Sequence, residues 1–259
     1  MFCSITNSGL EKGIKYDENG FPLYNYSSRK GISIGYQYNP IVFGWLSAKL
    51  YSGKNTDEDN KLKILQYAEK VTEKHIAGDR GIILMDFPCP LYSIENNWTS
   101  GLVAGRVIEL FVRAYKLSGD QKYLDRAGMF LHIFYEDIEE MGCRIIINSD
   151  EWWYEEYASP EIEPPFVLNG MISAVLCINE YFEISRDETA NLLVEKGIKA
   201  LIARLSGYDK NGYSYYDWKG KVASPLYHEY HVELLGRLMD KLPHEIFEKY
   251  RNKWTEGSS

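Results

Sequence analysis

The sequence is poor in basic residues relative to acidic ones, and it has few cysteines. Lysine and arginine number 29 against 37 aspartates and glutamates, which gives a formal net charge of −8 over 259 residues. Nucleic-acid binding needs a basic surface that neutralises phosphates, so this balance argues against a nucleic-acid partner. The 4 cysteines are scattered without C-x-x-C spacing, so free thiols are expected in place of disulfides or a zinc site.

Segments typical of export or membrane insertion are also missing. The first nine residues contain neither the basic run nor the apolar run of a signal peptide. The most apolar stretch, residues 166–178, is interrupted by Asn169 and Ser173 and is too short to span a bilayer. These features predict a cytoplasmic protein without a membrane span.

Motifs for phosphate, metal and serine chemistry are absent as well. Gly101-x-x-x-Gly105 lies within a helical pattern, where it indicates close helix packing and not a phosphate loop. His228 and His231 are three residues apart, whereas the H-E-x-x-H zinc motif places its histidines four apart. No serine is identified at a strand-to-helix nucleophile elbow, so a Ser-His-Asp triad is not expected. The sequence therefore predicts no metal and no cofactor.

Tyrosine, by contrast, is abundant, with 21 residues beside 6 tryptophans. Such side chains combine a flat apolar face with a polar edge, and they line many carbohydrate clefts. They also fill hydrophobic cores, and composition alone leaves both interpretations open.

Apolar periodicity predicts an all-α protein whose helices come in four consecutive hairpins. In each pair the first helix tends to be apolar and the second amphipathic, as an inner and an outer ring require. We therefore expect an (α/α) toroid with a few short β-strands near the functional site. The expected helices cover residues 40–51, 57–75, 99–117, 121–134, 166–182, 187–205, 227–242 and 244–254; strands are expected at 82–87, at 144–148 and within 151–157.

The domain organisation is expected to be simple. Residues 1–35 are rich in Gly, Tyr, Asn and Ser and form an N-terminal arm, with a turn near Asp17–Pro22 that allows one hairpin. Residues 36–259 form the toroid, and no linker within them suggests another domain.

Candidate functional residues fall into three clusters, each at a loop or a helix start. In a toroid such positions face one end of the central cavity, where functional groups commonly gather. Packing or simple solvation explains each residue taken alone, and the functional interpretation depends on three clusters of one chemical type. The clusters are residues 152–157, 213–217 and 227–231.

Together with residues 98–105 and 166–170, these clusters resemble the C-terminal α-helical domain of D-glucuronyl C5-epimerases, over residues 36–254. The resemblance implies an (α/α)-type toroid and places the family's catalytic glutamate and tyrosines at Glu156, Tyr157, Tyr216 and Tyr227. Residues expected to bind the substrate or to orient these groups are Arg113, Trp153, Asn169, Lys219, His228 and His231.

The chain departs from the family pattern in two ways. It has no room for the family's β-barrel domain, and Trp218 and Lys219 stand where the animal enzymes carry an arginine after the Tyr-Asp pair. Lysine neutralises a carboxylate but does not grip it in a bidentate way.

The expected function is epimerisation at C5 of a uronic acid, such as D-glucuronate, within an oligosaccharide or polysaccharide. Proton removal and return would be carried out by tyrosine and glutamate. Two alternatives remain open: a polysaccharide lyase that forms the same C5 carbanion, and a non-catalytic glycan-binding or scaffold domain. A homodimer is also left open.

Overall fold

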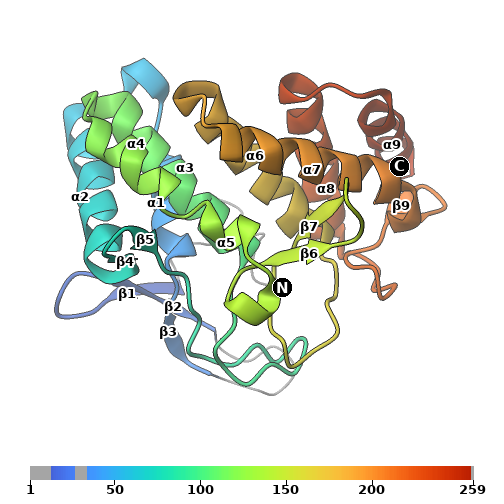
Figure 1. Ribbon diagram of the computed structural model, residues 1–259, viewed down its shortest axis with the longest axis horizontal. Coiled ribbons are helices and arrows are strands. Elements are labelled where there is room, and N and C mark those ends of the chain that lie inside the picture. The colour runs from blue at the N-terminus through green and yellow to red at the C-terminus, as the bar shows by residue number, and fades with distance from the viewer. Residues whose placement is uncertain (1–12, 27–33, 258–259) are drawn as a thin grey trace.

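Helices dominate the computed structural model, which describes residues 13–26 and 34–257 (Figure 1). The predictions made on residues 1–9 and on Cys3 lie outside the described residues. The helices are α1 (Ile41–Leu50), α2 (Glu58–His75), α3 (Gly101–Ser118), α4 (Gln121–Gly128), α5 (His132–Tyr135), α6 (Leu168–Ser185), α7 (Glu188–Arg204), α8 (Pro225–Lys241) and α9 (Glu245–Glu256). The strands are β1 (Ile14–Tyr16), β2 (Pro22–Asn25), β3 (Tyr36–Tyr38), β4 (Ile76–Ala77), β5 (Arg80–Gly81), β6 (Arg144–Ile146), β7 (Trp152–Tyr154), β8 (Asp209–Lys210) and β9 (Tyr213–Ser214).

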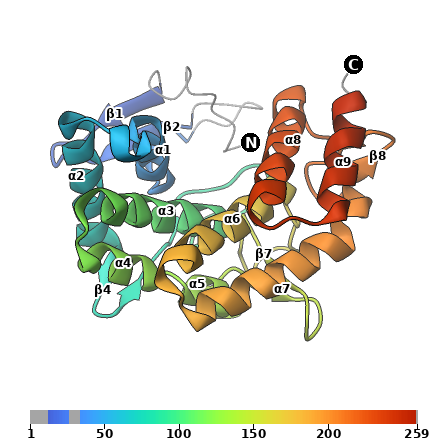
Figure 2. The ribbon, with the colours of Figure 1, turned by 90° about the horizontal axis from the view of Figure 1, so that it is seen from above.

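Consecutive helices pack against each other in four pairs, α1–α2, α3–α4, α6–α7 and α8–α9. Seen from above, α1, α3, α6 and α8 follow an inner arc, and their partners lie outside it (Figure 2). The predicted succession of helical pairs is thus confirmed. Closure of the arc into a complete toroid stays a prediction.

The burial of the inner and outer helices differs as the apolar patterns predict. Residues 101–114 of α3 and residues 168–179 of α6 are all buried, because each of these helices packs against several neighbouring helices. The outer helix α2 buries one stripe, formed by Ile64, Ala68, Val71 and His75.

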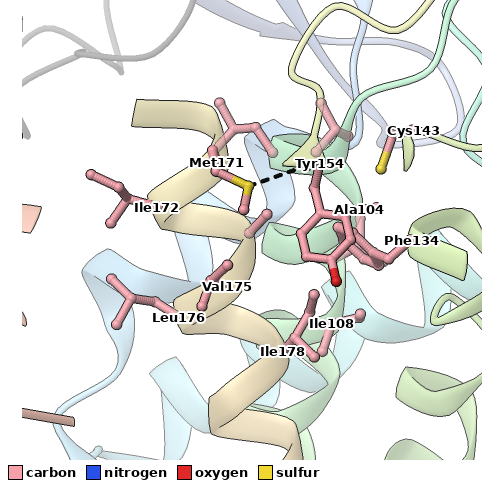
Figure 3. Packing of buried hydrophobic residues seen from close by; sticks show 14 of the residues in the cluster. Ala104, Ile108, Phe134, Cys143, Tyr154, Met171, Ile172, Val175, Leu176 and Ile178 are labelled. Carbon is pink, nitrogen blue, oxygen red and sulfur yellow. Dashed lines mark hydrogen bonds between the residues drawn. The ribbon is translucent and has the colours of Figure 1, made fainter. Parts of the chain in front are cut away.

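The two central helices approach closely where a small residue allows it. A Cβ atom on Gly105 would lie only 3.2 Å from the Cβ atom of Cys177, so the predicted role of this glycine in helix packing is confirmed. Tyr154 packs against α6 and α7: its backbone N–H donates to the Met171 sulfur over 3.2 Å (Figure 3), and its hydroxyl donates to the Leu193 carbonyl over 2.6 Å. Cys89, Cys143 and Cys177 are buried free thiols.

Two predicted elements are wrong. Residues 121–134 do not form one helix, because the chain leaves the helix after Gly128 and the Met129 carbonyl accepts the N–H of Gly81 in β5. Residues 82–87 are a loop with a single bridge from Met85 to Trp98, and not a strand. The hairpin allowed in the N-terminal arm is present as β1 and β2.

The loops before three inner helices gather at one end of the arc (Figure 1). The first residue of α3, Gly101, donates its N–H to the Glu155 carbonyl over 2.8 Å, and the first residue of α6, Leu168, donates to the Tyr216 carbonyl over 3.1 Å. The strands expected at 144–148 and within 151–157 are present as β6 and β7, which pair antiparallel to each other. Within the described part of the chain, every helix is too short or too polar to cross a bilayer.

Candidate active site

Four predicted catalytic residues meet where these loops converge. Glu156 and Tyr157 follow β7, Tyr216 follows β9, and Tyr227 lies in the first turn of α8. The hydroxyl groups of Tyr157 and Tyr216 are 3.5 Å apart. The rings of Tyr216 and Tyr227 pack edge to face with their centroids 4.8 Å apart. The structure therefore brings together three tyrosines from segments that are up to 70 residues apart in the sequence.

Glu156 is fixed against the start of α6. Its Oε2 accepts from the Asn169 side-chain amide over 2.9 Å. A Cβ atom on Gly170 would lie 2.5 Å from the Glu156 Cβ and 2.6 Å from Oε2, so this approach requires a residue without a side chain. The Phe-Val-Leu-Asn-Gly segment thus supplies both the amide that holds the carboxyl group and the space that it occupies.

The second carboxyl oxygen of Glu156 is available to accept a further hydrogen bond. Oε1 is buried without a hydrogen-bond partner among the described residues, and the same is true of the Asn169 Oδ1 atom. Unpaired buried oxygens are costly in a folded protein and often mark places where a ligand or water binds. Burial raises the pKa of the Glu156 carboxyl to about 7, although hydrogen bonds from Tyr157 and Asn169 act in the opposite direction. This group therefore changes its protonation near neutral pH.

Tyr157 and Tyr216 are neutral phenols at rest. Burial raises the pKa values of Tyr157 and Tyr216 well above 10, and the neighbouring Glu156 carboxyl pushes both in the same direction. A neutral phenol can donate a proton, and it becomes a base only where a cation or a hydrogen-bond donor stabilises its anion.

Glu155, the neighbour of Glu156, organises the loop. Its Oε1 accepts the backbone N–H groups of Glu156 and Tyr157 over 2.7 and 3.2 Å, and its Oε2 accepts that of Phe166 over 2.6 Å. Phe166 has a φ of 54°, which is rarely populated by residues other than glycine, and the Tyr208 hydroxyl also binds its carbonyl. This carboxylate therefore ties together the two ends of the loop that carries the catalytic candidates.

One pair at the site was not predicted. The Tyr92 hydroxyl donates to Asp217 Oδ2 over 2.8 Å, and the Tyr92 ring lies 5.0 Å from that of Tyr157. This pair joins the loop before α3 to the residue after Tyr216. Asp217 stood next to a predicted catalytic residue, but Tyr92 lies 125 positions away in the sequence and gave no local signal.

The two predicted histidines, both in α8, contact Ser214 of β9. The Ser214 N–H donates to His228 Nδ1 over 3.0 Å, and the Ser214 hydroxyl lies 2.8 Å from His231 Nδ1. His228 Nε2 donates to the Trp254 carbonyl over 3.1 Å, which fixes the tautomer of that ring. Burial lowers the pKa of His231 to about 3 and lowers that of His228 as well, so both are neutral at pH 7. Their contacts hold β9, which leads to Tyr216.

Three other predicted binding residues are engaged elsewhere. Trp153 is fully buried and stacks on Tyr208, with the ring planes 9° apart and the centroids 5.9 Å apart, which makes it a core residue. Lys219 is directed to Glu163, whose carbonyl it binds over 2.8 Å. Arg113 pairs with Glu109.

The position of Arg113 within α3 separates it from the tyrosine cluster. It lies twelve residues after Gly101, which corresponds to about 18 Å along the helix. Its Nη1 donates to the Ser47 hydroxyl over 2.9 Å and points toward the Gly44 carbonyl, 3.3 Å away. The structure therefore does not bring Arg113 to the cluster.

Within the described residues, no three His, Cys, Asp or Glu side chains converge in a way that could hold a metal ion. The groups that converge are phenols, carboxyls and an amide. This set can move protons and donate hydrogen bonds to an anionic substrate.

Comparison with known proteins relates this chain to one family of sugar-modifying enzymes. An uncharacterized protein of Methanocaldococcus jannaschii is 29% identical over 255 residues, covering 91% of this chain and 82% of its own length. D-glucuronyl C5-epimerase of Caenorhabditis elegans is 28% identical over 176 residues, covering 61% of this chain but only 28% of its own length.

A solved structure shares the fold. The crystal structure of D-mannose isomerase matches 91% of this chain and 67% of its own chain with a TM-score of 0.53, at 14% sequence identity. The family model of the D-glucuronyl C5-epimerase C-terminus matches residues 78–256, which include all four catalytic candidates. The chain therefore belongs to the D-glucuronyl C5-epimerase C-terminal family.

Proposed function

We propose that this protein is a cofactor-independent epimerase that inverts C5 of a uronic acid, such as D-glucuronate, in an oligosaccharide or polysaccharide. The observation that carries the proposal is the convergence of Glu156 with the buried hydroxyl pair of Tyr157 and Tyr216. Membership of the family supports the reaction class. The arc of helical pairs would form part of an (α/α) toroid whose central cavity receives the glycan.

The chemistry requires a base and an acid on opposite faces of the sugar. C5 of a uronate is α to a carboxylate, so loss of its proton leaves an enediolate with a second negative charge on the carboxyl group. Glu156 is assigned as the base, because a carboxyl with a pKa of about 7 is partly ionised at neutral pH. Its free Oε1 lone pair accepts the C5 proton.

The phenols are assigned as the acid. Tyr157 and Tyr216 are neutral at rest, and one of them delivers a proton to the opposite face of C5 as the enediolate collapses. The hydroxyl contact between them spreads the resulting phenolate charge over two oxygens. Tyr227 closes one side of this pair through its edge-to-face contact with Tyr216. Exchange of both groups with solvent restores the starting protonation states.

Incubation with a glucuronate-containing oligosaccharide in deuterated water tests the proposal. Deuterium at C5 with intact chains supports it, whereas a UV-absorbing unsaturated product identifies a lyase. Tyr157→Phe should slow the exchange by about 100-fold or more, because general acid–base catalysis contributes roughly that much. The matched control is Tyr250→Phe, a buried tyrosine in α9, which should leave the exchange unchanged. Glycan binding without any exchange by the wild-type protein would contradict the proposal.

A further inference from the structure

We infer that Arg106, clamped between Glu109 and Tyr230 inside the arc, binds the carboxylate of the substrate. The inference rests on the proposed function, because it names the cation that C5 proton removal requires. Neither Arg113 nor Lys219 supplies this cation, since both are engaged elsewhere.

Arg106 lies on α3 near the end of the helix that borders the tyrosine cluster. It follows Gly101 by five residues in α3, which corresponds to about 7.5 Å along the helix from the end that contacts the Glu155 carbonyl. Its Nη2 donates to the Tyr230 hydroxyl of α8 over 3.0 Å. This contact crosses the inner side of α6, because α6 lies between α3 and α8 in the arc (Figure 2).

A second contact fixes the depth of this crossing. The Tyr230 hydroxyl lies 3.4 Å from the Ser173 hydroxyl of α6. Ser173 is four residues after Asn169, the residue that holds Glu156, so it lies one helical turn further along the same face of α6. The Arg106–Tyr230 pair is therefore one turn below the carboxyl assigned as the base.

The charges around Arg106 leave one cation in excess. Glu109 is shared by two arginines: Arg106 Nη1 binds its Oε2 over 2.7 Å, and Arg113 Nη2 binds its Oε1. The three side chains are almost fully buried and carry a net charge of +1, from two cations and one anion. A buried excess charge is unfavourable unless a counter-ion compensates it. An anionic substrate group would provide that compensation.

The guanidinium of Arg106 also has an unused donor. Its Nε is buried without a hydrogen-bond partner among the described residues. Nε and the adjacent Nη form a planar fork that fits the two oxygens of a carboxylate. Arg113 differs, because both of its Nη atoms are bound, one to Glu109 and the other to Ser47. The two arginines are therefore similar in burial but not in their capacity to accept a ligand.

The test compares two probes by equilibrium binding. One is a glucuronate-containing oligosaccharide, and the other is the same oligosaccharide with its carboxyl groups reduced to the neutral sugar. Wild-type protein should bind the acid at least tenfold more tightly than the neutral form. Arg106→Gln should abolish this preference, and Arg106→Lys should retain part of it, because lysine keeps the charge but loses the fork. Thermal melting of each variant verifies folding.

Arg113→Lys serves as the matched control, because it alters the same ion network without touching the unused donor. It should keep the full preference for the acid. A preference that survives in Arg106→Gln or Arg106→Lys at the wild-type level, or no preference in the wild-type protein, overturns the inference. C5 exchange in deuterated water separates the two ideas: an Arg106-dependent preference without exchange defeats the proposed function alone.

Discussion

Two buried glutamates in this protein lie in opposite electrostatic environments. Glu156 contacts an amide and phenols, and burial raises its pKa to about 7. Burial alone would also raise the pKa of Glu109, but the charges of Arg113 and Arg106 outweigh it and lower the value to about 2. The comparison shows that the partners of a buried carboxyl, and not burial itself, decide whether it can exchange protons at neutral pH.

The largest expected effect concerns Glu156, which lies among uncharged groups. Glu156→Gln removes the assigned base while keeping the shape of the side chain, so the rate of C5 exchange should fall by about 10²–10⁴-fold. Deuterium incorporation measured by NMR gives the rate. Glu183→Gln provides the control, because Glu183 pairs with Lys241 at the surface and this substitution should leave the rate of C5 exchange unchanged. An unchanged rate in Glu156→Gln would remove this residue from the mechanism.

Removing the charge of Glu109 from its ion network with Arg106 and Arg113 should lower the stability of the protein. Glu109→Gln leaves two buried arginines without their shared anion, and the free energy of unfolding should drop by about 3–5 kcal/mol. Urea unfolding followed by circular dichroism measures this. The control is Glu183→Gln, which breaks a half-exposed pair with Lys241 and should cost less than about 1 kcal/mol. Equal losses in the two variants would show that the buried network is no stronger than a surface pair.

The contributions of Glu156 and Glu109 to stability should depend on pH with opposite signs. The folded pKa of Glu156 lies above the ordinary value of 4.5, so its contribution to stability is present below that value and is lost as pH rises to about 7. Glu109 contributes stability above pH 4.5, which is lost as pH falls toward about 2. From pH 4.5 to 7, the unfolding free energy of the wild type relative to Glu156→Gln should decline by roughly 3 kcal/mol. A difference that stays flat over this range would contradict the raised pKa.

The smallest expected effect concerns the placement of Glu156. In Gly170→Ala the new Cβ would meet the Glu156 Cβ and carboxyl, so the base must shift, and exchange should slow by about 10–100-fold. Gly105→Ala is the control, because it crowds Cys177 at the α3–α6 contact and should lower the melting temperature without a specific loss of rate. Full activity in Gly170→Ala would show that the position of this carboxyl is not critical.

The elements that could be predicted are those encoded by neighbouring residues. The helical pairs follow from apolar periodicity, and the helix expected over residues 187–205 begins at Asp187, whose side chain caps α7 by accepting the Ala190 N–H. The break after Gly128 could not be predicted, because the group that captures the Met129 carbonyl belongs to Gly81, 48 positions earlier. Local sequence thus determined where helices form, and distant hydrogen bonds determined where one of them stops.

The candidate site divides in the same way. Glu156, Tyr157, Tyr216 and Tyr227 lie in short recognisable segments, so they could be selected from the sequence. The cation could not be selected in this way. Arg106 and Arg113 lie on the same helix, and they differ only in their position along it and in the partners that other helices provide. Nothing in the sequence beside either arginine indicates which one keeps an unused nitrogen.

The gathering of helix starts at one end of the arc has a consequence for the attraction of anions. The peptide dipoles of a helix add up to about half a positive elementary charge at its first turn. Helices α3, α6 and α8 all begin beside the tyrosine cluster, so three such partial charges act together there. The backbone of a chain with a net charge of −8 thus contributes a positive potential at this end. Because no side chain carries that potential, exchanging surface lysines should leave it unchanged.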